Sequence, residues 1–170
     1  ARITLVLAAN PCPCGFFGDP VRECRCTPME IRRYLARLSG PLMDRVDLQV
    51  EVPRLRYEEL AAAQDGETSA TIRRRVEAAR RRQRERFGVE GIPCNAAMDV
   101  RAIRRYCSVT RDAKRVLESA FRRWNLSVRA HDRILKVART IADLEGSEQI
   151  TADHIGEAIQ YRVLDQKYWG

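Results

Sequence analysis

Residues 127–146 read SVRAHDRILKVARTIADLEG, and this stretch decides the fold. Its apolar side chains recur every three or four residues, as they do on one face of an α-helix. They are Ile134, Leu135, Val137, Ala138, Ile141, Ala142 and Leu144. Ser127 can cap the start of this helix, and Gly146 can stop it. The stretch therefore predicts a long amphipathic helix packed against other helices.

Helical spacing continues on both sides of this stretch. Apolar residues recur at helical intervals over 72–87, 102–106, 116–124 and 155–163, and eight arginines lie between 73 and 86. Residues suited to helix starts precede three of these segments, namely Asp99, Thr110 and Thr151. We therefore expect a helical bundle over 68–170, joined by a linker at 54–67 that bends at Asp65-Gly66.

The first 53 residues follow a different pattern. The continuous apolar run at 3–9 is typical of a buried strand in a parallel sheet, and 46–52 alternates apolar and polar residues like a strand with one polar face. Between them, Thr27-Pro28-Met29-Glu30 begins a helix with a capping box, and Ser39-Gly40-Pro41 breaks it. The expected fold class is mainly α: two strands and a helix in 1–53, followed by the helical bundle.

Composition narrows the class of protein. Of the 170 residues, 45% are hydrophobic and 32% charged, which allows a packed core and argues against disorder. The run at 3–9 is too short to span a bilayer, and no signal peptide is visible, so we expect a cytoplasmic protein. The first residue is Ala1 rather than Met, and a strand-like run follows at once. We therefore expect a piece of a longer protein.

The charge balance suggests a class of partner. The net charge is +8, and 28 of the 31 basic residues are arginine. A basic surface favours polyanions such as nucleic acid or nucleotides. The alternative is that an arginine bias reflects the base composition of a genome, with the side chains on ordinary solvated helix faces.

Four cysteines give the strongest local signal. Cys12-Pro-Cys14 and Cys24-Arg-Cys26 are separated by nine residues within a loop at 10–28 that is rich in proline and glycine. Two close thiol pairs can supply four ligands to a tetrahedral ion, for which Zn²⁺ is the default in a reducing compartment. Four protein ligands leave no open position, so the metal would be structural. The alternative is a reduced or adventitiously oxidised loop without metal. Cys94 and Cys107 are expected to be structural.

Three polar residues are weaker candidates. Asn10 follows the first predicted strand, where α/β sheets place ligand-contacting residues, although Asn-Pro also makes an ordinary turn. Arg45 directly precedes the second predicted strand; alternatively it is a surface arginine paired with Asp44 or Asp47. Arg129 lies in the first turn of the long helix, where a cation opposes the helix dipole unless an anionic ligand binds nearby.

Other catalytic patterns are missing from the sequence. His131 and His154 have no neighbouring nucleophile or ligand set, so we expect both to be ordinary helix residues. No glycine-rich phosphate loop ending in Lys-Ser/Thr is found in the chain. The sequence therefore carries no complete catalytic motif of its own.

Several longer blocks resemble a known family. They are Leu5–Gly15, Cys24–Cys26, Arg33-Tyr34, Leu38–Leu48 and Val137–Gly146. Together they resemble the magnesium-chelatase-like AAA+ ATPases of bacteria, and within these the ComM (YifB) group. The resemblance covers nearly the whole chain. It implies that 1–53 is the C-terminal part of an AAA+ core and that 68–170 is the helical lid of the magnesium chelatase C-terminal type.

The resemblance also assigns roles to the three weaker candidates. Asn10 matches sensor 1, which orients the water that attacks the γ-phosphate. Arg45 matches the arginine finger, which reaches the nucleotide of the neighbouring subunit. Arg129 matches the sensor 2 arginine, which contacts the nucleotide of its own subunit. The Walker A loop and the acidic Walker B strand, which hold ATP and Mg²⁺, have no counterpart here, so we expect this stretch alone to be inactive.

The resemblance implies binding partners for the protein, and two alternative functions remain open. It implies ATP, single-stranded or branched DNA, and neighbouring subunits of a hexameric ring, with a role in branch migration or unwinding during natural transformation. A motor subunit of a metal chelatase is the first alternative, and the thiol pairs at 12–14 and 24–26 argue against it. A stand-alone zinc-containing module that binds nucleic acid is the second, and it leaves Asn10, Arg45 and Arg129 unexplained.

Overall fold

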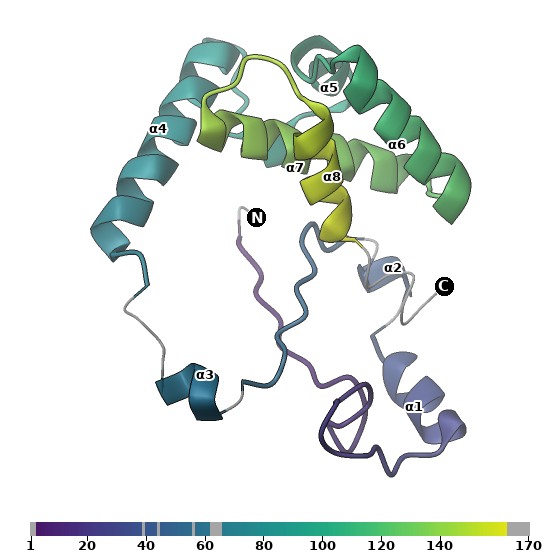
Figure 1. Ribbon diagram of the computed structural model, residues 1–170. Coiled ribbons are helices and arrows are strands. Elements are labelled where there is room, and N and C mark those ends of the chain that lie inside the picture. Colours follow the sequence, from purple (N-terminus) through teal and green to yellow (C-terminus); the bar gives the residue numbers. More distant parts are fainter. Residues whose placement is uncertain (1–2, 39, 44, 56, 62–65, 163–170) are drawn as a thin grey trace.

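The computed structural model describes all residues except 1–2, 39, 44, 56, 62–65 and 163–170. Its helices are α1 (Pro28–Leu35), α2 (Gly40–Met43), α3 (Tyr57–Ala61), α4 (Ser69–Phe87), α5 (Val100–Tyr106), α6 (Arg111–Trp124), α7 (Val128–Glu145) and α8 (Ala152–Gln160), with a short 3-10 helix η1 (Asn95–Ala97). Helices α4 to α8 form one bundle, and α1 and α3 lie apart from it (Figure 1). Within the described residues, no helix is long and apolar enough to cross a membrane.

The predicted helix starts are set by local hydrogen bonds. Ser127 Oγ accepts from the backbone N–H of Ala130 at 3.1 Å, and Thr110 does the same for α6. The capping box of α1 is complete, because Thr27 and Glu30 bond to each other's backbone. At the end of α7, Gly146 adopts a φ of +84°, a left-handed conformation that glycine accepts without strain. The long helix predicted over 127–146 is confirmed.

Helix α7 lies at the centre of the bundle. It packs against α8, α4, α5 and η1, and α6 packs against α8. Small residues allow the close approach, since Ala113, Ala138 and Ala142 are completely buried. Larger apolar residues fill the remaining space, among them Ile134, Ile150 and Ile155. The mainly helical fold class is therefore confirmed.

A buried charged cluster was not predicted. Asp143 of α7 is fully buried and forms an ion pair with Arg86 of α4. Arg139, which is 1% exposed, lies with its Nε 3.2 Å from the same carboxylate. Arg139 also donates to the carbonyl oxygens of Ser147 and Glu148 at 2.5 and 2.6 Å, and burial lowers its pKa. These contacts bind α4 and the α7–α8 loop to the central helix α7.

The two strands expected at 3–9 and 46–52 require correction. Both segments run as irregular chain, and the described residues contain only an isolated parallel bridge between Val109 and Ile150 (Figure 1). A strand exists only when its N–H and C=O groups pair in a ladder with another strand, and neither segment forms such a ladder within the described part of the chain. Their apolar side chains are uncovered, with Val6 and Val52 both 86% exposed.

Smaller differences concern element boundaries. Helix α1 ends at Leu35, before the predicted break, and α2 begins inside that break at Gly40. Helix α3 occupies part of the predicted linker, while its expected bend at Asp65 and the last predicted apolar residue, Val163, lie outside the described residues. Ile72 is 41% exposed, because the N-terminal half of α4 extends beyond the bundle.

Candidate functional site

The four thiols predicted as metal ligands come together in one cluster. The Cys12 Sγ lies 3.4 Å from that of Cys14 and 3.7 Å from that of Cys24, and the Cys14 and Cys24 sulfurs are 3.5 Å apart. With Cys26 included, all four sulfurs lie within 4.8 Å of one another. Four thiolates around a tetrahedral zinc ion at ~2.3 Å would be about 3.8 Å apart. The cluster thus fits a tetrahedral ion.

Disulfide bonds do not explain these distances. A disulfide joins two sulfurs at about 2.05 Å, far shorter than the 3.4 Å between Cys12 and Cys14. All four cysteines are free thiols, and Cys12 is fully buried. Four free thiols within 4.8 Å of one another, one buried and three half-buried, are what a metal would organise.

The loop around the cysteines is held by its own backbone. Gly15 donates its N–H to the carbonyl oxygen of Cys12 at 3.0 Å and has a φ of +82°, so a tight turn follows the first thiol pair. Asp19 Oδ1 accepts from the N–H groups of Val21 and Arg22, each at 2.8 Å. These bonds and the exposed charge of Arg54 lower the pKa of Asp19. The loop therefore returns on itself and brings the second thiol pair to the first.

Electrostatics differ within the thiol cluster. Backbone hydrogen bonds from Phe16 and Arg25 lower the pKa of Cys14 to about 6. Burial and the neighbouring thiols raise the pKa of Cys26 to about 12. The two thiols therefore ionise differently: backbone hydrogen bonds stabilise the Cys14 thiolate, whereas burial and the neighbouring thiols stabilise the protonated form of Cys26.

Asn10 lies beside the cysteine loop. Its side-chain amide faces the turn at Gly15, where an added Cβ would lie 3.8 Å from the Asn10 Cγ. The side chain is exposed. Because Asn10 is two residues before Cys12, the arrangement of the thiols also limits where this amide can point.

Arg45 and Arg129 lie on either side of a contact between the segment that follows α2 and helix α7. Arg45 follows α2, with its N–H bonded to the carbonyl oxygen of Leu42 at 2.9 Å. Two residues later, Asp47 forms an ion pair with Arg133 of α7, which is one helical turn after Arg129. Both Arg45 and Arg129 are exposed. The sequence left open a pairing of Arg45 with Asp47. Arg133 competes with Arg45 for this carboxylate, since Asp47 is bonded to Arg133.

The two histidines have different surroundings. His131 lies beside Asp132 and edge-on to Phe121. His154 is 1% exposed; its Nδ1 accepts from the N–H of Thr151 at 2.9 Å, so its Nε2 carries the proton and donates to Glu145 at 2.7 Å. His154 thus completes the cap of α8.

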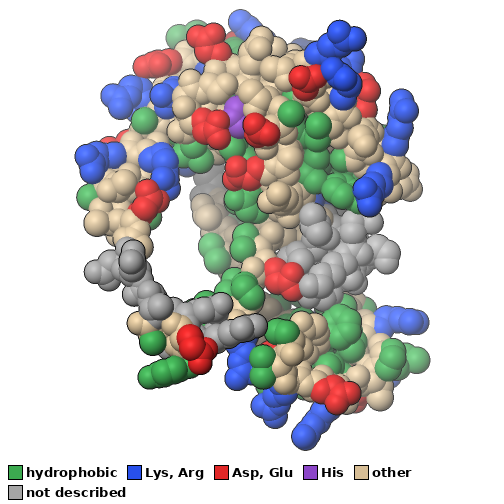
Figure 2. Space-filling view, in the orientation of Figure 1, with side chains coloured by type: hydrophobic (Ala, Val, Ile, Leu, Met, Phe, Trp, Pro, Cys, Tyr) green, Lys and Arg blue, Asp and Glu red, His purple; other side chains and the backbone are tan. Residues whose placement is uncertain are grey.

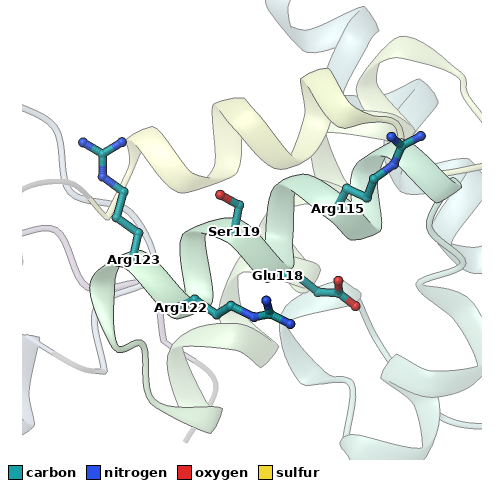
Figure 3. Close-up of a pocket in the computed structure, with 5 residues that line it drawn as sticks. All are labelled: Arg115, Glu118, Ser119, Arg122 and Arg123. Carbon is teal, nitrogen blue, oxygen red and sulfur yellow. The ribbon is translucent and has the colours of Figure 1, made fainter.

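On the face of the molecule shown in Figure 2, basic side chains do not gather into one patch. Figure 2 shows lysine and arginine at separate places on this face, with acidic residues between them. A hollow of about 470 Å³ lies along the outer side of α6 and is lined by Arg115, Glu118, Ser119, Arg122 and Arg123 (Figure 3). A single polar helix face provides no enclosed walls, so we assign it no small-molecule ligand.

Comparison with known sequences identifies the family. The family described as magnesium chelatase, subunit ChlI C-terminal, matches residues 66–162, and magnesium chelatase, subunit ChlI, matches residues 1–60. The chain belongs to the magnesium chelatase family. The resemblance inferred from the sequence blocks is therefore confirmed.

Curated relatives of this family member extend over nearly the whole chain. YifB of Salmonella typhimurium, described as uncharacterised, is 44% identical over 98% of this chain and 32% of its own length. Competence protein ComM of Haemophilus influenzae is 45% identical over 96% of this chain and 31% of its own. An uncharacterised protein of Mycobacterium tuberculosis is 43% identical over 95% of this chain and 32% of its own. The chain spans about a third of the length of these relatives.

Proposed function

We propose that this chain is the C-terminal part of a ring-forming ATPase of the magnesium chelatase family that acts on DNA in the cytoplasm. The observation that carries the proposal is the identity of 45% with competence protein ComM over 96% of the chain. Uptake and integration of DNA define competence, so a competence protein with a motor domain is expected to move or separate DNA strands. The free thiols suit a reducing cytoplasm.

In this proposal, three residues of the chain take part in phosphoryl transfer. The Asn10 amide orients the attacking water. The Arg45 guanidinium reaches the γ-phosphate bound by the neighbouring subunit, and Arg129 contacts the γ-phosphate in its own subunit. Charge builds up on the phosphoryl oxygens in the transition state, and preorganised guanidinium groups stabilise that charge. ATP and Mg²⁺ themselves would be held by a part of the protein that this chain does not contain.

Exposure supports these roles. Arg45 and Arg129 both have exposed side chains, as residues that contact a nucleotide must. Arg129 makes no ion pair with any residue the structure describes, and its helix has no acidic residue in the first turn. An unpaired cation at the positive end of a helix is unfavourable, and a phosphate bound there would remove that cost.

The thiol cluster is proposed to hold one structural zinc ion. The sulfur distances of 3.4–3.7 Å fit a tetrahedral site with no open position. The metal would fix the loop that carries Asn10 and begins α1, since Cys26 directly precedes the capping residue Thr27. Zinc would have a structural role here and would stabilise the loop, because all four ligands belong to the protein and no position is left open.

A metal chelatase motor remains the second candidate. The family descriptions name magnesium chelatase, and they match both parts of the chain. The thiol cluster distinguishes the two, since a chelatase motor of this family is not expected to carry these four cysteines. The observed clustering therefore favours the DNA motor.

The test is ATP hydrolysis by the longer protein with and without forked DNA. We expect DNA to stimulate turnover, with binding that weakens steeply as salt rises, because arginine contacts to phosphates release counterions. A matched double-stranded blunt DNA serves as control. Turnover that ignores DNA but responds to a porphyrin-binding partner would favour the chelatase instead.

A further inference from the structure

Three contacts join the segment after Arg45 to the helical bundle. The backbone N–H of Gln49 donates to the carbonyl oxygen of Tyr161 at 2.9 Å. Arg162 donates from its guanidinium to the carbonyl oxygen of Val46 at 2.7 Å. Asp47 forms the ion pair with Arg133. We call these three contacts the clasp.

The clasp differs from an ordinary surface contact. Arg162 is 5% exposed and Gln49 7% exposed, so two of the three contacts are shielded from water. A guanidinium bonded to a carbonyl oxygen in such a place is costly to separate, since the buried charge would lose its partner. The Asp47–Arg133 pair is more open, with the Asp47 side chain 52% exposed, and alone it would be weak. The shielded contacts keep the segment in place, and the ion pair sets its direction.

The clasp lies between the two proposed phosphate-contacting arginines. On one side, Asp47 is two residues from Arg45, whose own N–H is fixed to Leu42. On the other side, Arg133 follows Arg129 by four residues on α7, so both lie on the same face of that helix. A short chain of covalent and hydrogen-bonded links thus runs from Arg129 through Arg133 and Asp47 to Arg45.

We propose that Asp47, Arg133 and Arg162 are positioning residues that make Arg45 follow the orientation of the helical bundle. When a nucleotide contact moves the first turn of α7, the clasp carries that movement to the segment that presents Arg45. This inference rests on the proposed function, because it assumes that Arg45 reaches a nucleotide. It goes beyond that function by naming the residues that link the two sites.

Charge reversal tests the clasp in the longer protein. Asp47→Arg and Arg133→Asp each place like charges opposite one another, and the double variant restores an opposite pair. We expect each single variant to lower kcat about tenfold while leaving the dissociation constant for nucleotide unchanged, and the double variant to recover most of kcat. Arg75→Ala is the control, because Arg75 forms a similarly exposed pair with Glu67 away from the clasp.

A second readout does not depend on turnover. In the present chain, hydrogen exchange of the Gln49 amide should speed up in both single variants and slow again in the double variant. Unchanged thermal unfolding would show that the variants fold. A purely structural pair would not separate kcat from nucleotide affinity.

The outcomes separate this inference from the function on which it rests. If Arg45→Ala abolishes turnover but the charge reversals do not change kcat, the positioning role is wrong and the proposed function stands. If Arg45→Ala leaves turnover intact, the role of Arg45 itself is wrong. Failure of the double variant to recover kcat, in a folded protein, would also overturn the inference.

Discussion

The side-chain amide of Asn95 donates to the carboxylate of Asp143 at 2.8 Å, although 48 residues separate them in the sequence. The same amide nitrogen lies 3.0 Å from the hydroxyl of Thr140. Asn95 thereby ties η1 to α7 at the point where Arg86 and Arg139 also meet the aspartate. Asp143 is the one carboxylate, among the described residues of this cluster, that balances the buried Arg139 and the half-buried Arg86.

Replacement of Asp143 should strongly destabilise the bundle. Asp143→Ala leaves Arg139 buried without its counter-charge, and removing one partner of a buried pair costs about 3–5 kcal/mol. Urea denaturation followed by circular dichroism measures the loss. Glu118→Ala is the control, because Glu118 is exposed and its contact with Lys114 is 4.0 Å long, so less than about 1 kcal/mol is expected. Equal effects of the two variants would contradict this account.

The cysteine cluster should bind one zinc ion per chain. Protein purified without chelator should contain zinc by elemental analysis, and Cys14→Ser and Cys24→Ser should each lose it. Cys94→Ser should retain it, because Cys94 lies outside the cluster. Removal of the metal should increase hydrogen exchange over residues 10–26, since few apolar contacts otherwise order the loop. Four free thiols without zinc, in a loop that stays protected from exchange, would disprove the site.

In metal-free protein, Cys14 should be the most readily alkylated thiol of the cluster. Its pKa is lowered to about 6, so at neutral pH it is already a thiolate, which is the reactive form. Cys26, with a pKa raised to about 12, should resist iodoacetamide until strongly alkaline pH. Site-resolved mass spectrometry over pH 5–9 gives both rates. Unfolding in urea should remove the difference, and a difference that persists there would have a cause other than the folded loop.

The chain by itself should not hydrolyse ATP. A contact from Arg129 alone is one charge-assisted bond, worth about 1.5–3 kcal/mol, which supports millimolar binding at best. The phosphate loop and metal ligands that phosphoryl transfer requires are not found in the sequence. Malachite green assays of carefully purified chain should match buffer. ATP hydrolysis by the purified chain that Arg129→Ala abolishes would contradict the proposal that ATP and Mg²⁺ are held by a part of the protein outside this chain.

Mixed rings of the longer protein should distinguish Arg45 from Arg129. Arg45→Ala should lower turnover about 10³–10⁵-fold, as loss of an arginine finger does, while nucleotide still binds. Mixing these subunits with subunits whose own phosphate-loop lysine is mutated should restore part of the activity, because intact nucleotide sites then receive Arg45 from a neighbour. The same mixture made with Arg129→Ala should stay inactive. Equal recovery would mean that both arginines act on the neighbouring subunit's nucleotide.

Features that depend on near neighbours in the sequence could be predicted. The start of α7 follows from a hydroxyl three residues before the N–H it caps, and the thiol cluster follows from two closely spaced cysteine pairs. Both are governed by contacts within a few residues or one loop. The helical part of the fold could therefore be predicted from the sequence alone.

Features that depend on partners far apart in the sequence could not be predicted. The apolar run at 3–9 has the composition of a strand, but a ladder needs a second segment, and the pattern of one segment cannot supply it. The Asp143 cluster is similar: Arg139 and Asp143 lie four apart on an otherwise apolar helix face, which is a usable signal for a buried pair. Arg86, 57 residues from Asp143, has no such signal among the arginines of α4. The clasp likewise joins residues 86 and 116 positions apart.

The uncovered apolar segments have a practical consequence for anyone who handles this chain in solution. Leu5, Val6 and Leu7 are each more than half exposed, and so are Val50 and Val52. Exposed runs of β-branched and aliphatic residues can pair with the same runs of another molecule, so concentrated samples should form aggregates rich in cross-β structure. Thioflavin fluorescence that grows with protein concentration would reveal this. A shorter polypeptide covering residues 66–162, which contains the hydrophobic core cluster of the helical bundle, should stay monodisperse under the same conditions.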